Sequence, residues 1–119
     1  MPAKSRRLNI DPDAMRRHAS DAAQLLKALA NEKRLQILCL LAEGERSVGE
    51  INALLDLSQS ALSQHLAVLR EEGLVGTRRD AQNVFYALAP GPAFDIIHTL
   101  HGIYCSPAHL RAGAAGRHK

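Results

Sequence analysis

The stretch that decides the fold, residues 57–75, reads LSQSALSQHLAVLREEGLV. Ser58 is a favoured N-cap, because its hydroxyl can accept a hydrogen bond from a free amide in the first helical turn. Apolar residues then recur at helical spacing, at Leu62, Leu66 and Leu69. Gly73 ends the pattern, since glycine readily adopts the left-handed conformation that terminates helices. We therefore expect a helix after Ser58 that buries its leucine face.

The opposite face of this helix is predicted to be small, polar and uncharged. It presents Gln59, Ser60, Ser63, Gln64 and Ala67. Such side chains can enter the major groove of DNA and hydrogen-bond to base edges without steric conflict. Acidic residues, which phosphates repel, come only at the far end, at Glu71 and Glu72, where Arg70 could reach the DNA backbone. The helix therefore has the surface expected of a DNA-reading helix.

Upstream, three more helices are expected from their capping signals. Asp11 followed by Pro12 opens the first helix, and Asn31 caps a second helix that ends at Gly44. A capping box precedes a short third helix, because the side chains of Ser47 and Glu50 can each bond to the other's backbone amide. In the second helix, the residues predicted to share one face are Leu35, Leu38, Cys39 and Ala42.

Downstream of Gly73 the apolar period changes from helical to strand-like. Residues 74–79 and 83–88 are predicted to be two strands joined by a polar turn at 80–82. Pro92 opens a last helix that runs to about Ser106. A helix, a tight turn, a longer capped helix and then a hairpin is the order of a winged helix-turn-helix. The expected fold class is mainly α, with five helices and a two-stranded β-wing.

The predicted wing carries Arg78, Arg79 and Gln82. Arginines on a projecting ribbon beside a DNA-reading helix suit contact with phosphates or with the minor groove. The wing therefore adds basic residues to the predicted DNA surface.

The last predicted helix is apolar on more than one side, through Phe94, Ile96, Ile97, Leu100, Ile103 and Tyr104. A helix of this kind must be buried against two surfaces. The second surface is expected to be a partner subunit, which predicts a homodimer. Residues 11–106 then form one domain, and the basic residues 1–10 and the tail 107–119 are expected to be flexible ends.

The bulk composition limits the classes of function. A length of 119 residues allows one compact domain, and the net charge of +3 mildly favours a polyanionic partner. No stretch is apolar enough for a membrane span or a signal peptide, so we expect a cytoplasmic protein without a membrane partner. Because that compartment is reducing, we expect no permanent disulfide between the two cysteines. The chain has no phosphate-binding glycine loop and no nucleophile elbow, so we expect neither an enzyme nor a cofactor.

Three stretches resemble the arsenic-repressor (ArsR) family of transcriptional regulators. Residues 57–66 resemble its recognition-helix signature, 29–38 its second helix, and 67–75 the passage into its wing; the similarity spans about 14–106. The resemblance implies a homodimer, held by its first and last helices, that represses by binding a palindromic double-stranded operator and is released by an inducer. The expected DNA-binding residues are Gln59, Ser60, Ser63, Gln64, His65, Arg70, Arg78, Arg79 and Gln82.

The two cysteines raise the question of what the protein senses. Taken alone, Cys39 is typical of a small buried hydrophobic residue, whereas Cys105, at a helix end, is expected to be exposed. Their placement resembles a subgroup of the family that contains the biofilm growth-associated repressor, the sulfide:quinone reductase repressor and haemolysin-activator-type regulators. That resemblance implies a thiol sensor for persulfides and related reactive sulfur species or oxidants, in which a cross-link between the cysteines relieves DNA binding.

A metal sensor is the alternative. The short helix at 47–51 holds no cysteine or histidine, so the family's metalloid-type site is absent. His98, His101 and Cys105 fall at i, i+3 and i+7 of the last helix. His98 and Cys105 would lie about 10 Å apart along the axis, so a straight helix cannot bring all three to one zinc ion. A purely structural module, binding proteins rather than DNA, is a third interpretation. The thiol interpretation is favoured.

Overall fold

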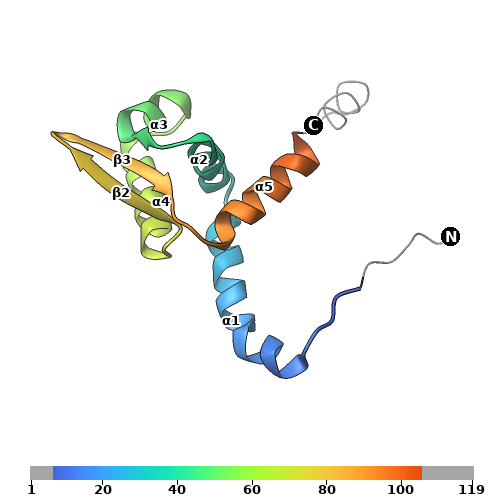
Figure 1. The fold of residues 1–119 in the computed structure, drawn as a ribbon. Helices are drawn as coiled ribbons and strands as arrows, with labels where there is room; N and C mark the ends of the chain where they lie inside the picture. The colour runs from blue at the N-terminus through green and yellow to red at the C-terminus, as the bar shows by residue number, and fades with distance from the viewer. Residues whose placement is uncertain (1–6, 106–119) are drawn as a thin grey trace, which may run out of the picture.

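The computed structural model describes residues 7–105, and its fold is mainly α, as predicted (Figure 1). The elements are α1 (Pro12–Leu29), α2 (Glu32–Glu43), β1 (Arg46–Ser47), α3 (Val48–Leu54), α4 (Gln59–Glu71), β2 (Val75–Asp80), β3 (Asn83–Leu88) and α5 (Pro92–Tyr104). Residues 7–10 are exposed and belong to no helix or strand. The remaining residues of the predicted flexible ends lie outside the described range.

The predicted N-caps start the first four helices. The side chain of Asp11 accepts a hydrogen bond from the amide of Asp13, and that of Asn31 from the amides of Lys33 and Arg34. Ser47 and Glu50 form the predicted capping box, at 2.8 and 3.1 Å, and Ser58 accepts from the amide of Ala61. Because these signals are local in sequence, they fix where each helix begins.

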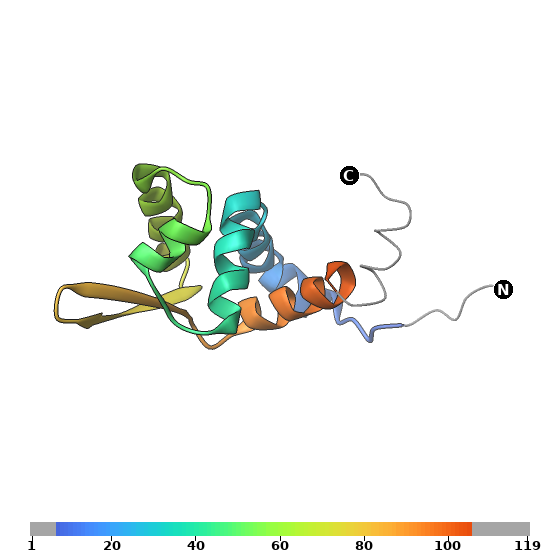
Figure 2. The same ribbon diagram turned by 90° about the horizontal axis from the view of Figure 1, so that it is seen from above.

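The wing is an antiparallel hairpin of β2 and β3 that projects from one end of the molecule (Figure 2). Its two-residue turn contains Ala81, which has a left-handed φ of 57°. The sheet also has a third strand that the sequence analysis missed. The two residues of β1 pair with β3, so the strand order is β1-β3-β2. A two-residue strand is too short to show an alternating pattern.

The core contains the leucine face of α4, as predicted. The largest fully buried side chains are Ile37, Leu38, Ile51, Leu62, Leu69 and Ile97. One expectation for α2 is wrong: its buried residues are Ile37, Leu38 and Leu41, and Cys39 is exposed. Residues 37–41 are all apolar, so several faces of this helix had similar hydrophobicity and only the packing distinguishes them.

The helices α1 and α5 extend away from the winged body (Figures 1 and 2). The buried residues of α1 are Ala28 and Leu29, at its end, whereas Met15 and Leu26 keep 51% and 57% of their surface exposed. On α5, Ile97 is buried but Ile103 is 51% exposed. Both helices therefore present apolar side chains to solvent within one chain. Between residues 7 and 105, no helix has the length and apolar character needed to cross a membrane.

Candidate DNA interface and dithiol site

The outer face of α4 is arranged as the sequence predicted. Gln59, Ser60, Ser63 and Gln64 are all exposed, and Arg70 is exposed near the end of the helix. His65 is half-buried, because it lies beside the buried leucine stripe. The structure therefore brings four amide or hydroxyl side chains together on one solvent-facing surface that contains no acidic residue before Glu71.

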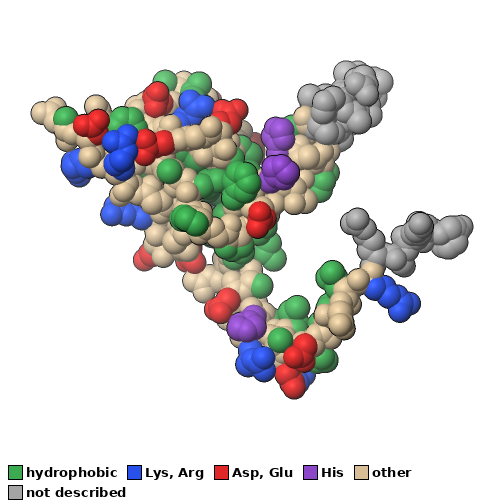
Figure 3. All heavy atoms as spheres, viewed as in Figure 1, with side chains coloured by type: hydrophobic (Ala, Val, Ile, Leu, Met, Phe, Trp, Pro, Cys, Tyr) green, Lys and Arg blue, Asp and Glu red, His purple; other side chains and the backbone are tan. Residues whose placement is uncertain are grey.

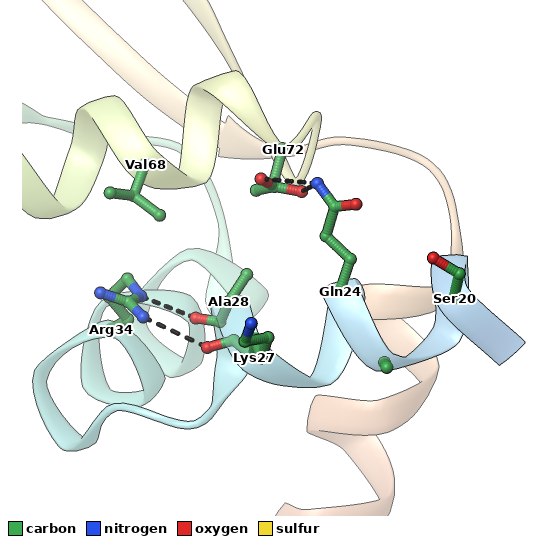
Figure 4. A pocket seen from close by; sticks show the side chains of 8 residues that line it. Ser20, Gln24, Lys27, Ala28, Arg34, Val68 and Glu72 are labelled. Atoms are coloured by element: carbon green, nitrogen blue, oxygen red, sulfur yellow. Dashed lines mark hydrogen bonds between the residues drawn. The ribbon is translucent and has the colours of Figure 1, made fainter.

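Side chains at the junction of α1, α2 and α4 hold the far end of α4 in place. They line a hollow of about 500 Å³ (Figure 4). The amide of Gln24 donates to both carboxylate oxygens of Glu72, at 3.0 and 3.1 Å. The guanidinium of Arg34 donates to the carbonyls of Ala28, at 2.7 Å, and Lys27, at 3.3 Å, and so satisfies the end of α1. Since Ser58 caps the other end, α4 is fixed at both termini.

The two arginines of the wing differ in their side-chain contacts. Arg79 is exposed and forms no side-chain hydrogen bond or ion pair with residues 7–105. Arg78 donates to both carboxylate oxygens of Glu45, from Nε at 3.0 Å and from Nη2 at 2.7 Å. Its guanidinium also lies over the ring of Phe85, 4.6 Å from the centroid. Figure 3 shows basic and acidic side chains next to each other over the wing.

Glu45 is a residue that the sequence analysis missed. The hydrogen bond from Arg78 holds the pKa of its carboxyl below the ordinary value. The two residues are 33 positions apart, and only the pairing of β1 with β3 brings them together. No local signal in the sequence could have joined them.

A hollow of about 470 Å³ lies between α3, the start of α4 and the wing tip. Its lining includes Gln59 and Gln82, so two predicted DNA-binding residues from different elements face one space. Asn52 also lines it, and within residues 7–105 the buried Oδ1 atom of Asn52 has no hydrogen-bond partner. The hollow thus brings amide side chains of α3, α4 and the wing turn to one place.

The two cysteines come from different helices that pack against each other. Cys39 is on α2, Cys105 is the C-cap of α5, and both are exposed. Partial burial raises the pKa of the Cys39 thiol, and the negative charges of the Cys105 thiolate and of Glu43 raise it further. The two thiols are thus carried by helices in contact, and the charge of one affects the pKa of the other.

Beside Cys39, α2 and α5 enclose a mainly apolar hollow of about 430 Å³. Its lining residues are Cys39, Leu40, Ala42, Glu43, Phe94, Ile97, His98 and His101. The rings of Phe94 and His98 stack with centroids 5.9 Å apart, and Figure 3 shows histidine side chains along α5 on the side of α2. Within residues 7–105, no group of three or more His, Cys, Asp or Glu side chains could hold a metal ion. A zinc site using His98 and His101 would need ligands from elsewhere.

Comparison with known proteins identifies the family. The family description "Bacterial regulatory protein, arsR family" matches residues 31–77. The transcriptional activator HlyU of Vibrio cholerae is 56% identical over 91 residues, which cover 76% of this chain and 84% of HlyU. The chain belongs to the ArsR family. The biofilm growth-associated repressor of Agrobacterium fabrum is 51% identical to this ArsR-family chain over 94 residues, covering 79% of the chain and 80% of the repressor.

Solved structures confirm the winged helix-turn-helix fold of this ArsR-family regulator. Reduced HlyU from Vibrio cholerae superposes with a TM-score of 0.75 at 55% identity, covering 78% of this chain and 98% of HlyU. A homodimeric winged helix-turn-helix DNA-binding domain from Mycobacterium bovis gives 0.68 at 30% identity, covering 93% of this chain and 97% of that domain. The two curated relatives are named as transcriptional regulators, not enzymes.

Proposed function

We propose that this ArsR-family regulator is a homodimeric repressor that leaves its operator when a persulfide cross-links Cys39 and Cys105. The observation that carries the proposal is that α2 and α5, the two helices that bear the exposed thiols, pack against each other, and Cys105 also raises the pKa of Cys39. A thiol pair on two packed helices can act as a switch, because a covalent link changes how the two helices sit against each other. One relative is a named repressor and another a named activator, so repression is part of the proposal.

The DNA-binding part of the proposal rests on α4 and the wing. The exposed face of α4 would enter the major groove, with Ser63 and Gln64 reading base edges. Gln82 and Arg79 on the wing would contact the adjacent backbone or minor groove. A protein-interaction module would show no steep loss of DNA affinity with rising salt, whereas phosphate binding requires it.

The homodimer is supported by the exposed apolar side chains of the outer helices. Met15 and Leu26 on α1, and Phe94 and Ile103 on α5, keep 44–57% of their surface exposed in one chain. Covering such faces removes apolar surface from water, which favours association. The homodimeric Mycobacterium bovis domain, which has the same fold, supports the same assembly.

The chemistry of the switch can be written as two sulfur displacements. The Cys105 thiolate attacks the terminal sulfur of a persulfide R–S–S–H; the S–S bond breaks, R–S⁻ leaves, and Cys105 carries –S–SH. The Cys39 thiolate then attacks Sγ of Cys105 and releases HS⁻, which leaves a disulfide. Two thiols lose two electrons, and one sulfur atom is reduced to hydrosulfide. We assign the first attack to Cys105 because the raised pKa of Cys39 lowers its thiolate fraction.

A direct disulfide requires Cα atoms about 4.4–6.8 Å apart, so a wider separation favours a bridge that retains extra sulfur atoms. Such a bridge forms when Cys39 is itself converted to a persulfide before it attacks. Either link would pull α2 against α5. Because α5 is also part of the proposed dimer seam, the paired recognition helices would lose the spacing of about 34–36 Å that successive half-sites require. The expected coupling is about 1–3 kcal/mol.

The test uses reduced protein and duplex DNA from the promoter region of its own gene. Organic persulfide is expected to weaken binding, measured by fluorescence anisotropy, and a reductant should restore it. Cys39→Ser and Cys105→Ser should each abolish the response, and mass spectrometry should find one intrachain link between the two cysteine peptides. A full response in either variant, or a link only between subunits, contradicts the switch.

The same assay separates the zinc alternative. Release of DNA by nanomolar zinc from the Cys39→Ser variant would favour a metal sensor built on His98, His101 and Cys105 and would contradict the thiol proposal. The thiol proposal expects zinc to leave DNA binding unchanged at that concentration.

A further inference from the structure

We propose that Glu45, Arg78 and Phe85 form a clamp that fixes the wing against the end of α2, so that Arg78 positions the wing while Arg79 contacts DNA. We call these three residues the wing clamp. The inference rests on the proposed DNA binding by α4 and the wing. It goes beyond that proposal because it separates the roles of two adjacent arginines and connects the wing to the helix that carries Cys39.

The wing clamp crosses the whole sheet. Arg78 on β2 is paired in register with Phe85 on β3, and Phe85 is paired with Ser47 on β1. Side chains of paired residues lie on the same face of a sheet. The guanidinium of Arg78 therefore extends over the Phe85 ring and reaches Glu45, just before β1. One side chain therefore connects β2 with β3 and with the residue that leads into β1.

The contacts of Arg78 with Glu45 and Phe85 have a geometry that holds the Arg78 side chain in one position. An isolated surface ion pair contributes little, but a bidentate guanidinium–carboxylate pair with good geometry is an exception. Here both carboxylate oxygens accept, at 2.7 and 3.0 Å, and the ring centroid lies 4.6 Å from the guanidinium carbon. Asp80 adds a weaker attraction at 3.9 Å. Rotating the Arg78 side chain away from this position would break both hydrogen bonds to Glu45 and the contact with the Phe85 ring.

The wing clamp also connects the wing to the end of α2, the helix that carries Cys39. The last residue of α2 is Glu43, its C-cap is Gly44, and the next residue is Glu45. The Glu45–Arg78 ion pair therefore adds a side-chain connection between the end of α2 and β2, beside the backbone pairing of β1 with β3. Arg79, the next residue on β2, alternates to the opposite face and stays available for DNA.

The Glu45→Gln variant separates the wing clamp from a purely electrostatic role of Glu45, because the two predict opposite changes in DNA affinity. Removing a negative charge near DNA should strengthen binding if Glu45 merely repels phosphates or withholds Arg78 from them. The clamp predicts weaker binding instead, by roughly threefold to tenfold, because the wing loses its fixed position. Arg78→Gln should cause a similar loss, and the double variant Glu45→Gln/Arg78→Gln no greater one, since both single changes break the same ion pair.

Arg79→Gln is the matched control. It should lower the magnitude of the slope of log K against log salt by about 0.9 for each phosphate that Arg79 neutralises, whereas Arg78→Gln and Glu45→Gln should change the slope equally, because both release the same wing. A slope that is lowered in Arg78→Gln but not in Glu45→Gln, or tighter binding by Glu45→Gln, would assign Arg78 to DNA and overturn the clamp. Circular dichroism of each variant checks that the fold is retained.

Hydrogen–deuterium exchange without DNA tests the clamp separately from the proposed function. Amides of β2 and β3 are expected to exchange faster in Glu45→Gln, and also in Arg78→Lys, because an ammonium cannot donate two parallel hydrogen bonds to one carboxylate. Unchanged exchange in both variants overturns the clamp. If the wild-type chain binds no duplex at all but its wing exchange changes as expected, then the proposed function fails and the clamp stands.

Discussion

Replacing Ser63 and Gln64 with glutamate tests whether the exposed face of α4 reads DNA. Both side chains point to solvent on the helix that Leu62 and Leu69 anchor in the core, so the double variant should fold normally. In the proposed complex, each change removes a polar contact with a base edge and places a carboxylate beside the phosphates. The variant should therefore lose sequence-specific binding and keep its fold and assembly.

The expected loss follows from the two substituted positions in each subunit. A good contact with a base edge contributes about 1–3 kcal/mol of discrimination. A carboxylate placed about 4 Å from a phosphate in water adds about 1 kcal/mol of repulsion. Taking the lower value at each position, two positions cost about 4 kcal/mol, which is a factor of roughly 1,000 in Kd. The second subunit of a homodimer would increase the loss.

The control for charge is Gln36→Glu, which makes the same amide-to-carboxylate change at an exposed position on α2 and is compared with the single variant Gln64→Glu. Fluorescence anisotropy with a labelled operator duplex measures Kd, and sedimentation velocity compares the assemblies. The control should bind within a few-fold of wild type. Equal losses in both variants would mean that net charge alone governs binding, and an unchanged Kd for Ser63→Glu/Gln64→Glu would show that α4 is not the reading helix.

Three further expectations concern stability and thiol chemistry. Leu69→Ala should lower the free energy of unfolding by about 2.7–5.0 kcal/mol in urea titrations, because Leu69 is fully buried. Leu54→Ala should cost far less, because Leu54 is exposed on α3. Equal losses in the two variants would contradict the assigned core. Ser47→Ala removes half of the capping box and should cost about 1 kcal/mol, measured by the same titrations, with Thr at this position restoring most of it. Cys105→Ser should lower the pKa of Cys39 toward its ordinary value, because a neighbouring negative charge is removed. The pH profile of alkylation at Cys39 would then move to lower pH. An unmoved profile would place the two thiols far apart.

Capping and breaking signals made most of the fold predictable. Ser58 and Gly73 bracket α4, and the first four helices start at the caps that the sequence indicates. These features depend on residues within a few positions of each other, so no tertiary context is needed to recognise them. The change of apolar period placed the second strand at 83–88, as observed, and the first at 74–79, one residue before the observed β2.

The residues that sequence analysis misjudged depend on contacts between distant segments. The apolar run around Cys39 allowed several buried faces, and packing against α5 and the core selected one that leaves the thiol exposed. Arg78 has the same local signature as Arg79, a basic residue on a hairpin. Its partner Glu45 is revealed only by the strand order, which periodicity does not encode.

The connections of the two thiol-bearing helices explain why a link between them would affect the wing. The helix that carries Cys39 leads within a few residues into β1, and β3 leads within a few residues into the helix that ends at Cys105. The amide of Ala89 donates to the carbonyl of Leu74 at 3.0 Å, so the segment entering α5 is also bonded to the residue preceding β2. Pulling the two helices together therefore acts on both sides of one small sheet. Because packed elements move as rigid bodies rather than stretching, we expect such a link to tilt the sheet relative to α4, and that tilt would change which phosphates the wing could reach.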